Sequence, residues 1–485
     1  MKRCFAGKVI TLVTLSCAAF LVACAGSAPA VGQDEFAVEQ TEPAVQSKPD
    51  VTANIPEEHR EVASDVPAEA LPGETVEKDS AGTPEASDVS DTVAAVPETV
   101  NMPEPVDAQE AVGALESPAV SDTVVTKVSF FAVGDVLFHT PLFNACKADE
   151  NKCDFDPIFK NWKSDIESAD FAAVNQETIL VSREMGFSSY PAFGTPEQVG
   201  DAEIAAGFDI VTHATNHTID RGAAAIDYTL NFWKSKGEAS PIILGIHGSA
   251  EDKRAIRYAE KNGIKFAFFN NTYGLNGQKM PEDRQYLVDM QDENDEWLKP
   301  IAEADKNADV VVFFMHVGTE YVPIPSEDAQ KKVRKAIDAG ADIVVCHHPH
   351  VVEPFGVVST PKGNTGLVYW SLGNFISNQK ENPKLLGGVA KFVVQKTAVG
   401  ENASFAVTEA TFEGSVTHWD ANGYTAIPLK DYTDSLAKRH AGKHASLKEL
   451  QKLFTEAREG YSRCGTEKAS ERLPMPISPL GGVRE

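Results

Sequence analysis

The stretch "ADIVVCHHPH", residues 341–350, decides the fold of this chain. Its apolar run from Ile343 to Cys346 is short and continuous, which is typical of a strand buried on both faces of a parallel sheet. A helix-like segment around residues 326–340 leads into the run, and three histidines follow directly behind it. A helix that precedes a doubly buried strand predicts an α/β unit, with polar side chains presented where the strand ends.

The same alternation of helix-like segments and apolar runs extends on both sides of this stretch, from Thr126 onward. Helices are expected at residues 156–169, 195–207, 222–237, 251–262, 295–307 and 326–340. Strands are expected at residues 128–135, 170–177, 208–217, 241–246, 264–272, 308–318, 341–350, 366–375, 387–396 and 404–414. The last three strands have no helices between them, which predicts that part of the sheet is antiparallel. The pattern as a whole predicts an α/β layered domain.

The beginning of the chain differs in composition from this central part. Residues 1–24 combine early basic residues with a short apolar run that ends in "LVAC", which is typical of a secretory signal rather than a membrane-spanning helix. "LVAC" resembles the lipobox of bacterial lipoproteins, which implies lipidation of Cys24 and anchoring at the extracytoplasmic face of the cell membrane. The alternative is an ordinary cleaved signal in which Cys24 stands by chance.

Residues 25–125 are acidic and contain a single aromatic side chain. They hold 22 Asp and Glu against 3 Lys and Arg, and 11 of the 28 prolines, so they carry most of the net charge of −27. Such a segment cannot bury enough apolar surface to offset its ordering entropy, which predicts a disordered linker. Residues 126–485, which follow the linker and include the domain at residues 126–430, are only mildly acidic, so no nucleic-acid partner is expected. Residues 431–485 predict a polar C-terminal appendage with one amphipathic helix.

Four of the seven cysteines lie outside the signal and the lipobox. Two of them, Cys146 and Cys153, lie close together in a polar segment. In an exported protein this pair would either form a local disulfide or remain as two free thiols, and composition leaves both alternatives open.

Polar residues that can bind a metal end five of the expected strands. They are Asp135, Glu177, Asn216 with His217, His316, and the group His347, His348 and His350. Ligands of open α/β sheets bind outside the carboxyl ends of the strands, so these residues are expected to converge. Singly, each has an ordinary interpretation as a turn, cap, core or surface residue. Together, carboxylates, imidazoles and a carboxamide favour one or two ions of Mn, Zn or Fe over Ca, which takes oxygen ligands almost alone.

Six motifs carry a resemblance to a known family: "AVGDVLFH", "VNQETIL", "ATNHTIDRG", "MHVGTEY", "CHHPHVVEP" and "YWSLGNFI", in that order. They resemble the bacterial capsule-synthesis CapA family, associated with poly-γ-glutamate biosynthesis, over roughly residues 128–379. That family is similar in fold to the calcineurin-like metallophosphoesterases. The resemblance implies an α/β, four-layer metallophosphatase-like β-sandwich flanked by helices.

The resemblance also implies roles for individual residues. The implied metal ligands are Asp135, Glu177 in the bridging position, Asn216, His316, His348 and His350. His217 would donate a proton to the leaving oxygen or stabilise its developing charge. Arg221 and Asn374 would contact substrate, although Asn commonly closes turns and Arg commonly pairs on surfaces. His347 receives no role.

Two features depart from the metallophosphoesterase pattern. Asp135 is followed by Val136 and Leu137 instead of the usual Asp-x-His, so the nearest histidine is His139. The bridging position holds Glu177, which has a longer arm than the usual Asp. A site with a single metal, or a binding role without metal, therefore stands beside the two-metal interpretation.

Two functions follow as hypotheses. The first is a membrane-anchored, extracytoplasmic hydrolase with a metal-dependent site, acting on a phosphoester or an anionic polymer of the capsule or envelope. The second is a non-catalytic anchoring or export component of a membrane-bound capsule polymer synthase. In either case the acidic linker would repel a polyanionic product, so it is expected to act as a spacer.

Overall fold

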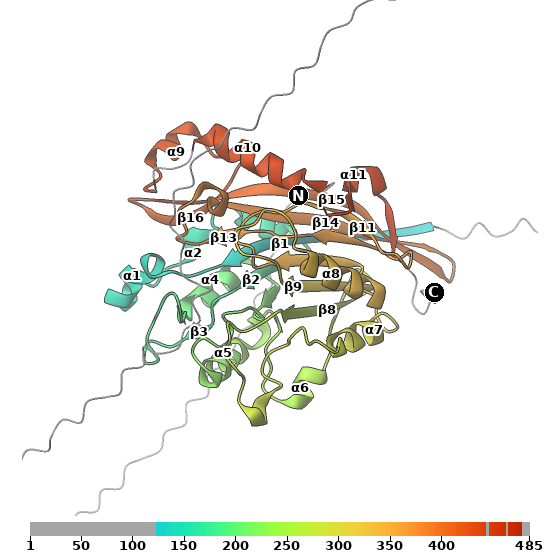
Figure 1. Cartoon of the computed structure of the whole chain (residues 1–485), viewed down its shortest axis with the longest axis horizontal. Helices are drawn as coiled ribbons and strands as arrows, with labels where there is room; N and C mark the ends of the chain where they lie inside the picture. The colour runs from blue at the N-terminus through green and yellow to red at the C-terminus, as the bar shows by residue number, and fades with distance from the viewer. Residues whose placement is uncertain (1–122, 443–445, 462–463, 478–485) are drawn as a thin grey trace, which may run out of the picture. The chain divides into compact units, whose positions relative to one another are not determined.

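The alternation of side chains along each central strand builds two stacked sheets. The computed structural model describes residues 123–442, 446–461 and 464–477. In β1 (Thr123–Val136), Phe130 and Ala132 enter one apolar core, whereas Phe131 enters another on the opposite face. Successive residues of a strand point to opposite faces, so a strand that is apolar at every position must be covered on both. Figure 1 shows the helices arranged around the strands.

The first sheet has the strand order β16-β15-β14-β1-β2-β5-β6, with β13 paired to β1 and β18 paired to β15. Strands β1, β2, β5 and β6 are parallel to one another, whereas β14, β15 and β16 join antiparallel. Besides β1, the strands of this sheet are β2 (Phe171–Gln176), β5 (Ile210–Thr212), β6 (Ile242–Leu244), β13 (Asn374–Ile376), β14 (Leu386–Val399), β15 (Asn402–Asp420), β16 (Gly423–Pro428) and β18 (Met475–Ile477).

The second sheet has the order β17-β11-β12-β10-β9-β8-β7, in which β8, β9, β10 and β12 are parallel. Its strands are β7 (Arg257–Lys261), β8 (Ile264–Thr272), β9 (Val310–His316), β10 (Ile343–His347), β11 (Phe355–Ser359), β12 (Thr365–Tyr369) and β17 (Thr466–Glu467). A separate two-stranded sheet pairs β3 (Leu180–Val181) with β4 (Thr195–Pro196).

Helices cover the outer faces of both sheets. Apolar residues of α1 (Thr140–Ala148), α2 (Asp156–Phe159), α3 (Lys163–Ser168), α4 (Gln198–Ala206) and α5 (Ala223–Ser235) join the core outside the first sheet. Those of α7 (Lys299–Ala304) and α8 (Glu327–Ala339) join the core outside the second. The largest core lies between the sheets. Helix, sheet, sheet and helix are the four layers that the family resemblance implied, so the predicted fold class is confirmed.

Some local expectations were wrong. Residues 251–262, expected as one helix, form the short α6 (Ala250–Arg254) and the antiparallel edge strand β7. Thr195 and Pro196 form β4 rather than the start of a helix, and α4 begins at Gln198. In both cases the pairing of a partly polar segment with its neighbour prevails over helical spacing.

The segment beyond residue 430 is part of the fold rather than an appendage with one helix. It contains α9 (Asp434–Arg439), α10 (Leu447–Arg458) and α11 (Ala469–Arg472), and its strands β17 and β18 pair with β11 and β15. Leu450 and Phe454 of α10 are buried in the largest core. The amphipathic helix expected there is α10. The predicted signal, Cys24 and residues 25–122 of the predicted linker lie outside the described residues. Residues 123–125, which were predicted as the end of the linker, belong instead to β1.

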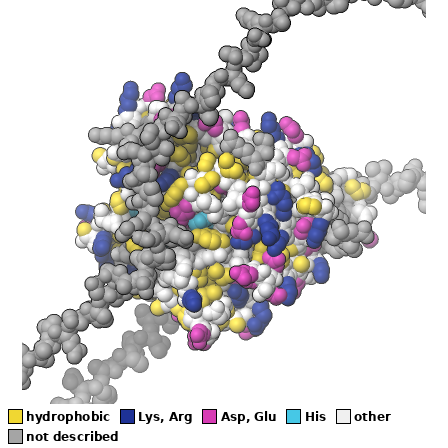
Figure 2. All heavy atoms as spheres, viewed as in Figure 1, with side chains coloured by type: hydrophobic (Ala, Val, Ile, Leu, Met, Phe, Trp, Pro, Cys, Tyr) yellow, Lys and Arg dark blue, Asp and Glu magenta, His cyan; other side chains and the backbone are white. Residues whose placement is uncertain are grey.

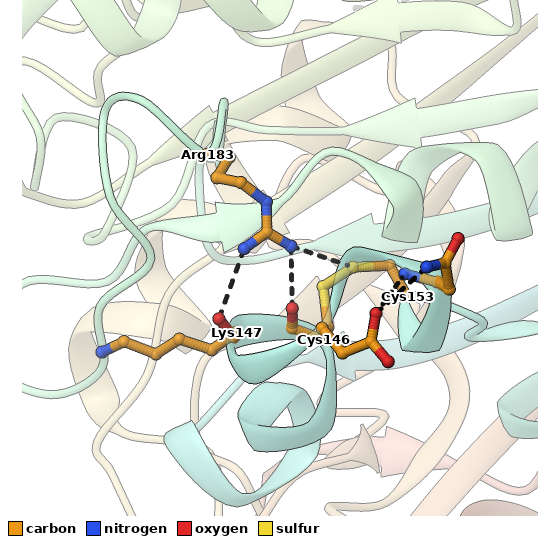
Figure 3. Close-up of a disulfide and its surroundings, with 6 residues drawn as sticks. Cys146, Lys147, Cys153 and Arg183 are labelled. Atoms are coloured by element: carbon orange, nitrogen blue, oxygen red, sulfur yellow. Dashed lines mark hydrogen bonds between the residues drawn. A yellow bond between two sulfur atoms is a disulfide. The ribbon is translucent and has the colours of Figure 1, made fainter.

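A disulfide joins Cys146 and Cys153 at the end of α1. Arg183 fastens this segment, because its guanidinium donates to the carbonyl oxygens of Cys146 at 2.8 Å and Lys147 at 3.3 Å (Figure 3). Of the two states left open by composition, the structure therefore has the paired one. Within the described residues, we find no helix with the length and apolarity that crossing a bilayer requires.

Glu203 of α4 is fully buried, and neither of its carboxylate oxygens has a hydrogen-bond partner in the described part of the chain. Burial raises its pKa well above the ordinary value of 4.5. The folded protein therefore keeps a proton that the unfolded chain releases above about pH 4.5, so this residue makes folding less favourable as pH rises.

Replacing Glu203 by Gln is therefore expected to stabilise the protein at pH 8 by about 1–3 kcal/mol, and much less at pH 4.5. Urea unfolding at the two pH values measures the difference. The control is Asp201→Asn, because Asp201 is half-exposed and pairs with Lys236 at the surface. An equal effect of Glu203→Gln at both pH values would contradict the prediction.

Candidate metal centre

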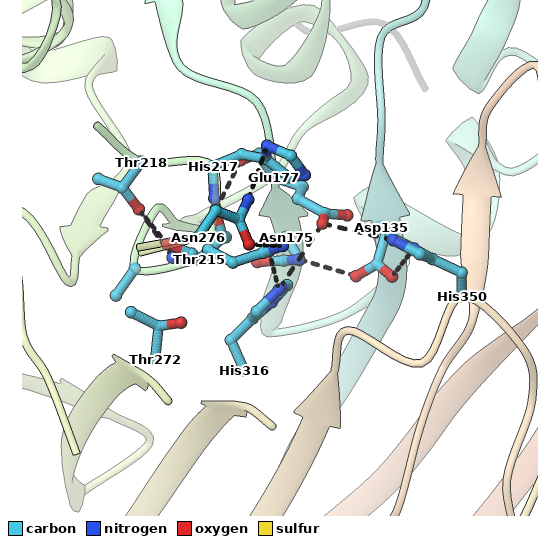
Figure 4. Close-up of polar contacts among 12 residues, drawn as sticks. Asp135, Asn175, Glu177, Thr215, His217, Thr218, Thr272, Asn276, His316 and His350 are labelled. Atoms are coloured by element: carbon cyan, nitrogen blue, oxygen red, sulfur yellow. Dashed lines mark hydrogen bonds and ion pairs between the residues drawn. The ribbon is translucent and has the colours of Figure 1, made fainter. Parts of the chain in front are cut away.

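The carboxyl ends of strands from both sheets meet at one buried polar cluster. Asp135 lies near the end of β1, Glu177 directly follows β2, and His316 ends β9. Asn216 and His217 lie in the loop after β5, and the loop after β10 brings His350 (Figure 4). All of these side chains are at least nine-tenths buried. Segments that are far apart in the sequence therefore contribute polar groups to one small volume.

Glu177 is shared by two groups of possible ligands. One contains Asp135, Glu177 and His350, and the other contains Glu177, His316 and His348. Within each group the candidate ligand atoms lie within 4.8 Å of one another. In the first group, Nδ1 of His350 lies 3.0 Å from Oδ2 of Asp135, and its Nε2 lies 3.6 Å from Oε1 of Glu177. A carboxylate common to both groups occupies the position in which it would bridge two ions.

Asn216 joins the second group. Its Oδ1 lies 2.9 Å from Nε2 of His316, and the same nitrogen lies 3.6 Å from Oε1 of Glu177. The amide nitrogen of Asn216 donates to Asn276 at 3.2 Å, which turns the amide oxygen toward His316. The structure thus brings together all six residues proposed from the sequence as metal ligands.

The loop after β10 holds its histidines in an uncommon backbone conformation. His348 has φ 103° and His350 has φ 58°, which side-chain-bearing residues rarely adopt. Between them, Pro349 packs so closely on Gly318 that a Cβ there would lie 2.7 Å from Cγ of the proline. This packing, together with the ring contact of His348 and His316 at 4.9 Å, keeps both imidazoles directed at the cluster.

The two buried carboxylates of the cluster, Asp135 and Glu177, favour a positive charge between them. Burial raises the pKa of Glu177 well above its usual range. Burial acts against the charge of His350, but Glu177 and Asp135 raise the pKa of this imidazole to about 9. Burial would likewise raise the pKa of Asp135, and the hydrogen bond and charge of His350 bring it below its ordinary value. Cationic charge between the carboxylates is what this site favours.

The unpaired atoms of the cluster test whether a metal fits. Among the described residues, neither oxygen of Glu177 has a hydrogen-bond donor, and Nδ1 of both His316 and His348 lacks a partner. Buried polar atoms are nearly always satisfied, so the two unpaired oxygens of Glu177, the carboxylate common to both ligand groups, need an explanation. Carboxylate oxygens and imidazole nitrogens are donors that Mn, Zn and Fe accept. The residues present therefore fit a divalent metal site, without fixing which metal.

A histidine–aspartate pair lies beside the two groups. Nδ1 of His217 is 2.7 Å from Oδ2 of Asp220, which also accepts from the Phe193 backbone N–H at 2.8 Å. The Phe193 ring packs against His217 edge-to-face with centroids 4.7 Å apart. Gln278 donates to the other oxygen of Asp220. His217 is therefore fixed in orientation, with Asp220 holding one ring nitrogen. Sequence reasoning missed Asp220, although the spacing in "NHTID" could have suggested it.

His347 belongs to neither ligand group, although its side chain lies on the same face of the second sheet as that of its register partner His316. It is the last residue of β10, and its Nε2 contacts the carbonyl oxygen of Val133 in β1 at 3.3 Å, across the two sheets. Burial chiefly lowers the pKa of His347. Its surroundings are those of a neutral residue that joins the sheets.

His347→Gln is accordingly expected to keep most of the bound metal, whereas His348→Gln and His350→Gln are each expected to lower it about tenfold or more. Metal content after gel filtration, measured by elemental analysis on the three variants, checks this. Equal loss from all three would show the assignment within "HHPH" to be wrong.

The two residues proposed to contact substrate have protein partners. Arg221 donates from Nη1 to Gly186 and Ser188, and from Nη2 to Met185, so its guanidinium holds the loop at residues 185–188. Asn374 is fully buried and pairs in register with Asp135, while its Nδ2 donates to Gln379 at 2.8 Å. These contacts describe scaffold positions next to the cluster.

His139, the histidine nearest to the first motif, lies near the cluster but in neither ligand group. Its Nδ1 accepts from the Asn378 backbone N–H at 3.3 Å, and its ring packs against Phe193. Burial lowers its pKa to about 4, so it is neutral at physiological pH.

The four-layer α/β sandwich, with carboxylates and imidazoles at the carboxyl ends of its strands, is a metallophosphatase-like fold. The chain belongs to the family described as bacterial capsule synthesis protein PGA_cap, whose model matches residues 129–379. That range includes all the cluster residues described above.

Two curated proteins are similar in sequence. The chain is 28% identical over 262 residues to capsule biosynthesis protein CapA of Bacillus anthracis, covering 52% of this chain and 60% of that one. It is 30% identical over 249 residues to PGA biosynthesis protein CapA of Bacillus subtilis (strain 168), covering 48% and 55%. The chain thus spans little more than half the length of these relatives.

Solved structures show a more distant likeness. A putative 5'-nucleotidase from Staphylococcus aureus in complex with alpha-ketoglutarate matches with a TM-score of 0.39 and 14% identity, over 68% of this chain and 58% of that chain. The NAD nucleotidase NadN of Haemophilus influenzae matches with a TM-score of 0.35 and 12% identity, over 70% and 61%.

Proposed function

We propose that this protein is an extracytoplasmic, metal-dependent hydrolase that acts on a phosphoester or a related bond during the synthesis of a capsule or envelope polymer. The observation that carries the proposal is the pair of buried ligand groups that share Glu177, whose carboxylate oxygens have no donor within the described chain. Such a pair is suited to two ions held a short distance apart.

The residues divide into ligands and a proton donor. Asp135, Glu177 and His350 would hold one ion, and the ligands of the other would be Glu177, Asn216, His316 and His348. When bound, divalent ions supply Lewis acidity for the reacting oxygens and lower the pKa of water. The protein chain itself supplies a rigid, buried frame, because every one of these side chains starts from a strand end or a tightly packed loop.

His217 is the group suited to donate a proton to the leaving oxygen. Asp220 holds the Nδ1 side of the ring at 2.7 Å, which leaves Nε2 as the nitrogen free to face a substrate. Phe193 fixes the ring plane from the side.

The proposed location is the outer face of the cell membrane. The lipobox-like "LVAC" that ends at Cys24 supports a lipid anchor, and the Cys146–Cys153 disulfide is of the kind that forms in an oxidising, extracytoplasmic compartment. Residues 25–122 would then serve as the spacer between anchor and domain.

The test uses the full-length chain in detergent with bis(p-nitrophenyl) phosphate as a generic phosphodiester. We expect the untreated protein to hydrolyse this substrate. Chelation should abolish the hydrolysis, and addition of Mn²⁺ or Zn²⁺ should restore it. Elemental analysis of the untreated protein should give one or two divalent ions per chain. A protein that holds no metal after incubation with Mn²⁺, Zn²⁺ or Fe²⁺ would refute the proposal.

A second candidate is a non-catalytic component of a polymer synthase complex, favoured by the match to a capsule synthesis family. Deleting the gene from its host should then abolish the surface polymer, while a double variant of His217→Ala and His348→Ala should restore it to the deletion strain. Failure of the double variant to restore the polymer, at normal protein level, would reject this alternative in favour of the hydrolase.

A further inference from the structure

The segment that follows β8 lies against the metal centre. Tyr273 donates its backbone N–H to the carbonyl oxygen of His316 at 3.0 Å, and its ring contacts His348 with centroids 4.7 Å apart. Two residues later, Leu275 is buried in the core outside the first sheet. Residues 273–278, named the β8 loop, are thus anchored both to the strand ends of the second sheet and to the core outside the first.

Asn276 of this loop is exposed, yet its amide reaches the buried cluster. Its Oδ1 accepts from Nδ2 of Asn216 at 3.2 Å, and its Nδ2 lies 3.4 Å from Nδ1 of His217 (Figure 4). On the face in view, Figure 2 shows little histidine surface among the described residues, in agreement with the burial of His217 and His316. One side chain at the surface therefore contacts both a proposed metal ligand and the proposed proton donor.

The hydrogen bond between the two amides decides which end of Asn216 faces the second ligand group. A carboxamide has an accepting oxygen at one end and a donating nitrogen at the other. Because Asn276 presents its oxygen, the nitrogen of Asn216 turns toward it, and Oδ1 of Asn216 is left 2.9 Å from Nε2 of His316. Metal ions bind the oxygen of an amide, so this orientation is the one that a ligand needs. Without Asn276, either end of the Asn216 amide is free to face the group.

The backbone of the β8 loop suits an asparagine at this position. Asn276 has φ 51° and Gly277 has φ 75°, both in the left-handed region. Asn enters this region more readily than most residues with a side chain, and Gly enters it without steric cost. The backbone N–H of Gln278 donates to the carbonyl oxygen of Leu275 at 2.9 Å, which closes a tight turn around the two residues. The turn fixes where the side chains of residues 276 and 278 leave the chain.

Gln278 reaches the other part of the centre. Its Nε2 donates at 3.1 Å to Oδ1 of Asp220, and Oδ2 of the same carboxylate lies 2.7 Å from Nδ1 of His217. The two oxygens of Asp220 thus have separate partners, so the carboxylate cannot rotate without losing one of them. The β8 loop therefore contributes one side chain to a proposed ligand and another to the partner of the proposed proton donor.

We propose that the β8 loop positions the metal centre through these two side chains. Asn276 holds the amide of Asn216 with its oxygen toward the second ligand group. Gln278 holds Asp220 and, through it, the ring of His217. Both are positioning residues, because each acts through another side chain, and loss of such an outer partner typically costs about 10–100-fold in metal affinity or activity. The Gln278 part rests on the proposed function, whereas the Asn276 part requires only bound metal.

The test of Asn276 is metal binding, which requires no turnover. The full-length chain in detergent is stripped with a chelator and titrated calorimetrically with Mn²⁺ and, in parallel, with Zn²⁺. We expect two ions per chain, and His316→Gln identifies the binding step of the second ligand group. Glycine adopts a φ of 51° without strain, so Asn276→Gly should keep its backbone and weaken that step about tenfold to hundredfold. Asn276→Asp retains the accepting oxygen and should bind the ions no more weakly than the wild type.

The matched control is Asn262→Gly. Asn262 lies at the opposite end of β8 with nearly the same φ, 52°, and its Nδ2 donates to the Lys127 carbonyl oxygen at 2.8 Å. This variant should bind both ions like the wild type. Unchanged affinity in Asn276→Gly, an equal loss in Asn262→Gly, or ion binding that His316→Gln does not alter would each overturn the role of Asn276. A wild type that takes up no ion would overturn this role together with the proposed function.

The test of Gln278 is kinetic. Gln278→Leu should keep both ions, because Asp220 lies in neither ligand group, while kcat for an alkyl phosphodiester falls about fivefold with little change in KM. The fall should be smaller for a p-nitrophenyl phosphodiester, whose leaving group needs no proton. Equal falls for both substrates, or loss of metal, would overturn the role of Gln278. A wild type that binds two ions through Asn276 but hydrolyses neither substrate would refute the hydrolase and the Gln278 part, and would leave the role of Asn276 standing.

Discussion

Replacing Glu177 by Ala is expected to remove bound metal from the whole centre and to lower kcat/KM for a phosphodiester by about a thousandfold or more. The reason is geometric, since this one carboxylate belongs to both ligand groups. Loss of any other ligand leaves one group complete, whereas loss of Glu177 leaves neither. Elemental analysis and steady-state kinetics on the full-length variant check the two parts of the prediction.

Unfolding of the Glu177→Ala variant would also remove the metal and the activity, so the stability of the variant must be measured as well. The buried Glu177 carboxylate has no donor in the described chain and a raised pKa, which means that it destabilises the metal-free fold. In the presence of a chelator, Glu177→Ala should therefore melt no lower than the wild type. Glu203→Gln, which removes a buried acid that belongs to neither ligand group, serves as the control and should keep its metal. Metal retained in Glu177→Ala would contradict the shared-carboxylate arrangement.

The second large effect is expected at His217. His217→Ala should lower kcat by about a hundredfold to ten-thousandfold while metal content stays at the wild-type level, because His217 lies in neither ligand group. The fall in kcat should be much smaller for a p-nitrophenyl phosphodiester, because its p-nitrophenolate leaving group needs no proton, than for an alkyl phosphodiester. The comparison of the two leaving groups measures proton donation directly.

Asp220 should act through His217. Asp220→Asn keeps the size of the side chain but replaces the carboxylate that holds Nδ1 of His217 at 2.7 Å, so the ring loses its orientation and kcat should fall with little change in KM. Metal content should stay at the wild-type level, because Asp220 lies in neither ligand group. An unchanged kcat in the variant would show that Asp220 only holds the loop through the Phe193 N–H.

The sequence predicted correctly those strands whose residues form continuous apolar runs. Runs such as residues 310–315 have every side chain buried, and such runs predicted the doubly covered strands. Because parallel strands must end at the same edge, the ligand-capable residues behind them could be expected to meet, and the structure places them together. Strand positions and side-chain chemistry were therefore enough to predict that the six residues proposed as ligands lie together. Their role in binding metal stays a prediction.

The rest depended on contacts that no local pattern carries. Strands of two or three residues, such as β17 and β18, show no periodicity and exist only through their partners. The role of Asp220 follows from how a loop folds back on His217. Arg221 looked available for a substrate, yet its donors are directed to three loop residues, which only the path of the chain at residues 185–188 reveals.

Strands from the C-terminal part of the chain, β14 and β18, pair within the first sheet, and this determines when the protein can complete its fold. Central strand β1 pairs on one side with β14, whose residues follow it by more than two hundred positions, and β15 in turn pairs with β18. Contacts so distant in sequence form late and slowly. During synthesis from the N-terminus, the first sheet stays unfinished until residue 477 is available. Under the proposed export, a chain in that condition would still lack the long-range pairings of its first sheet, and it would complete them only on the far side of the membrane.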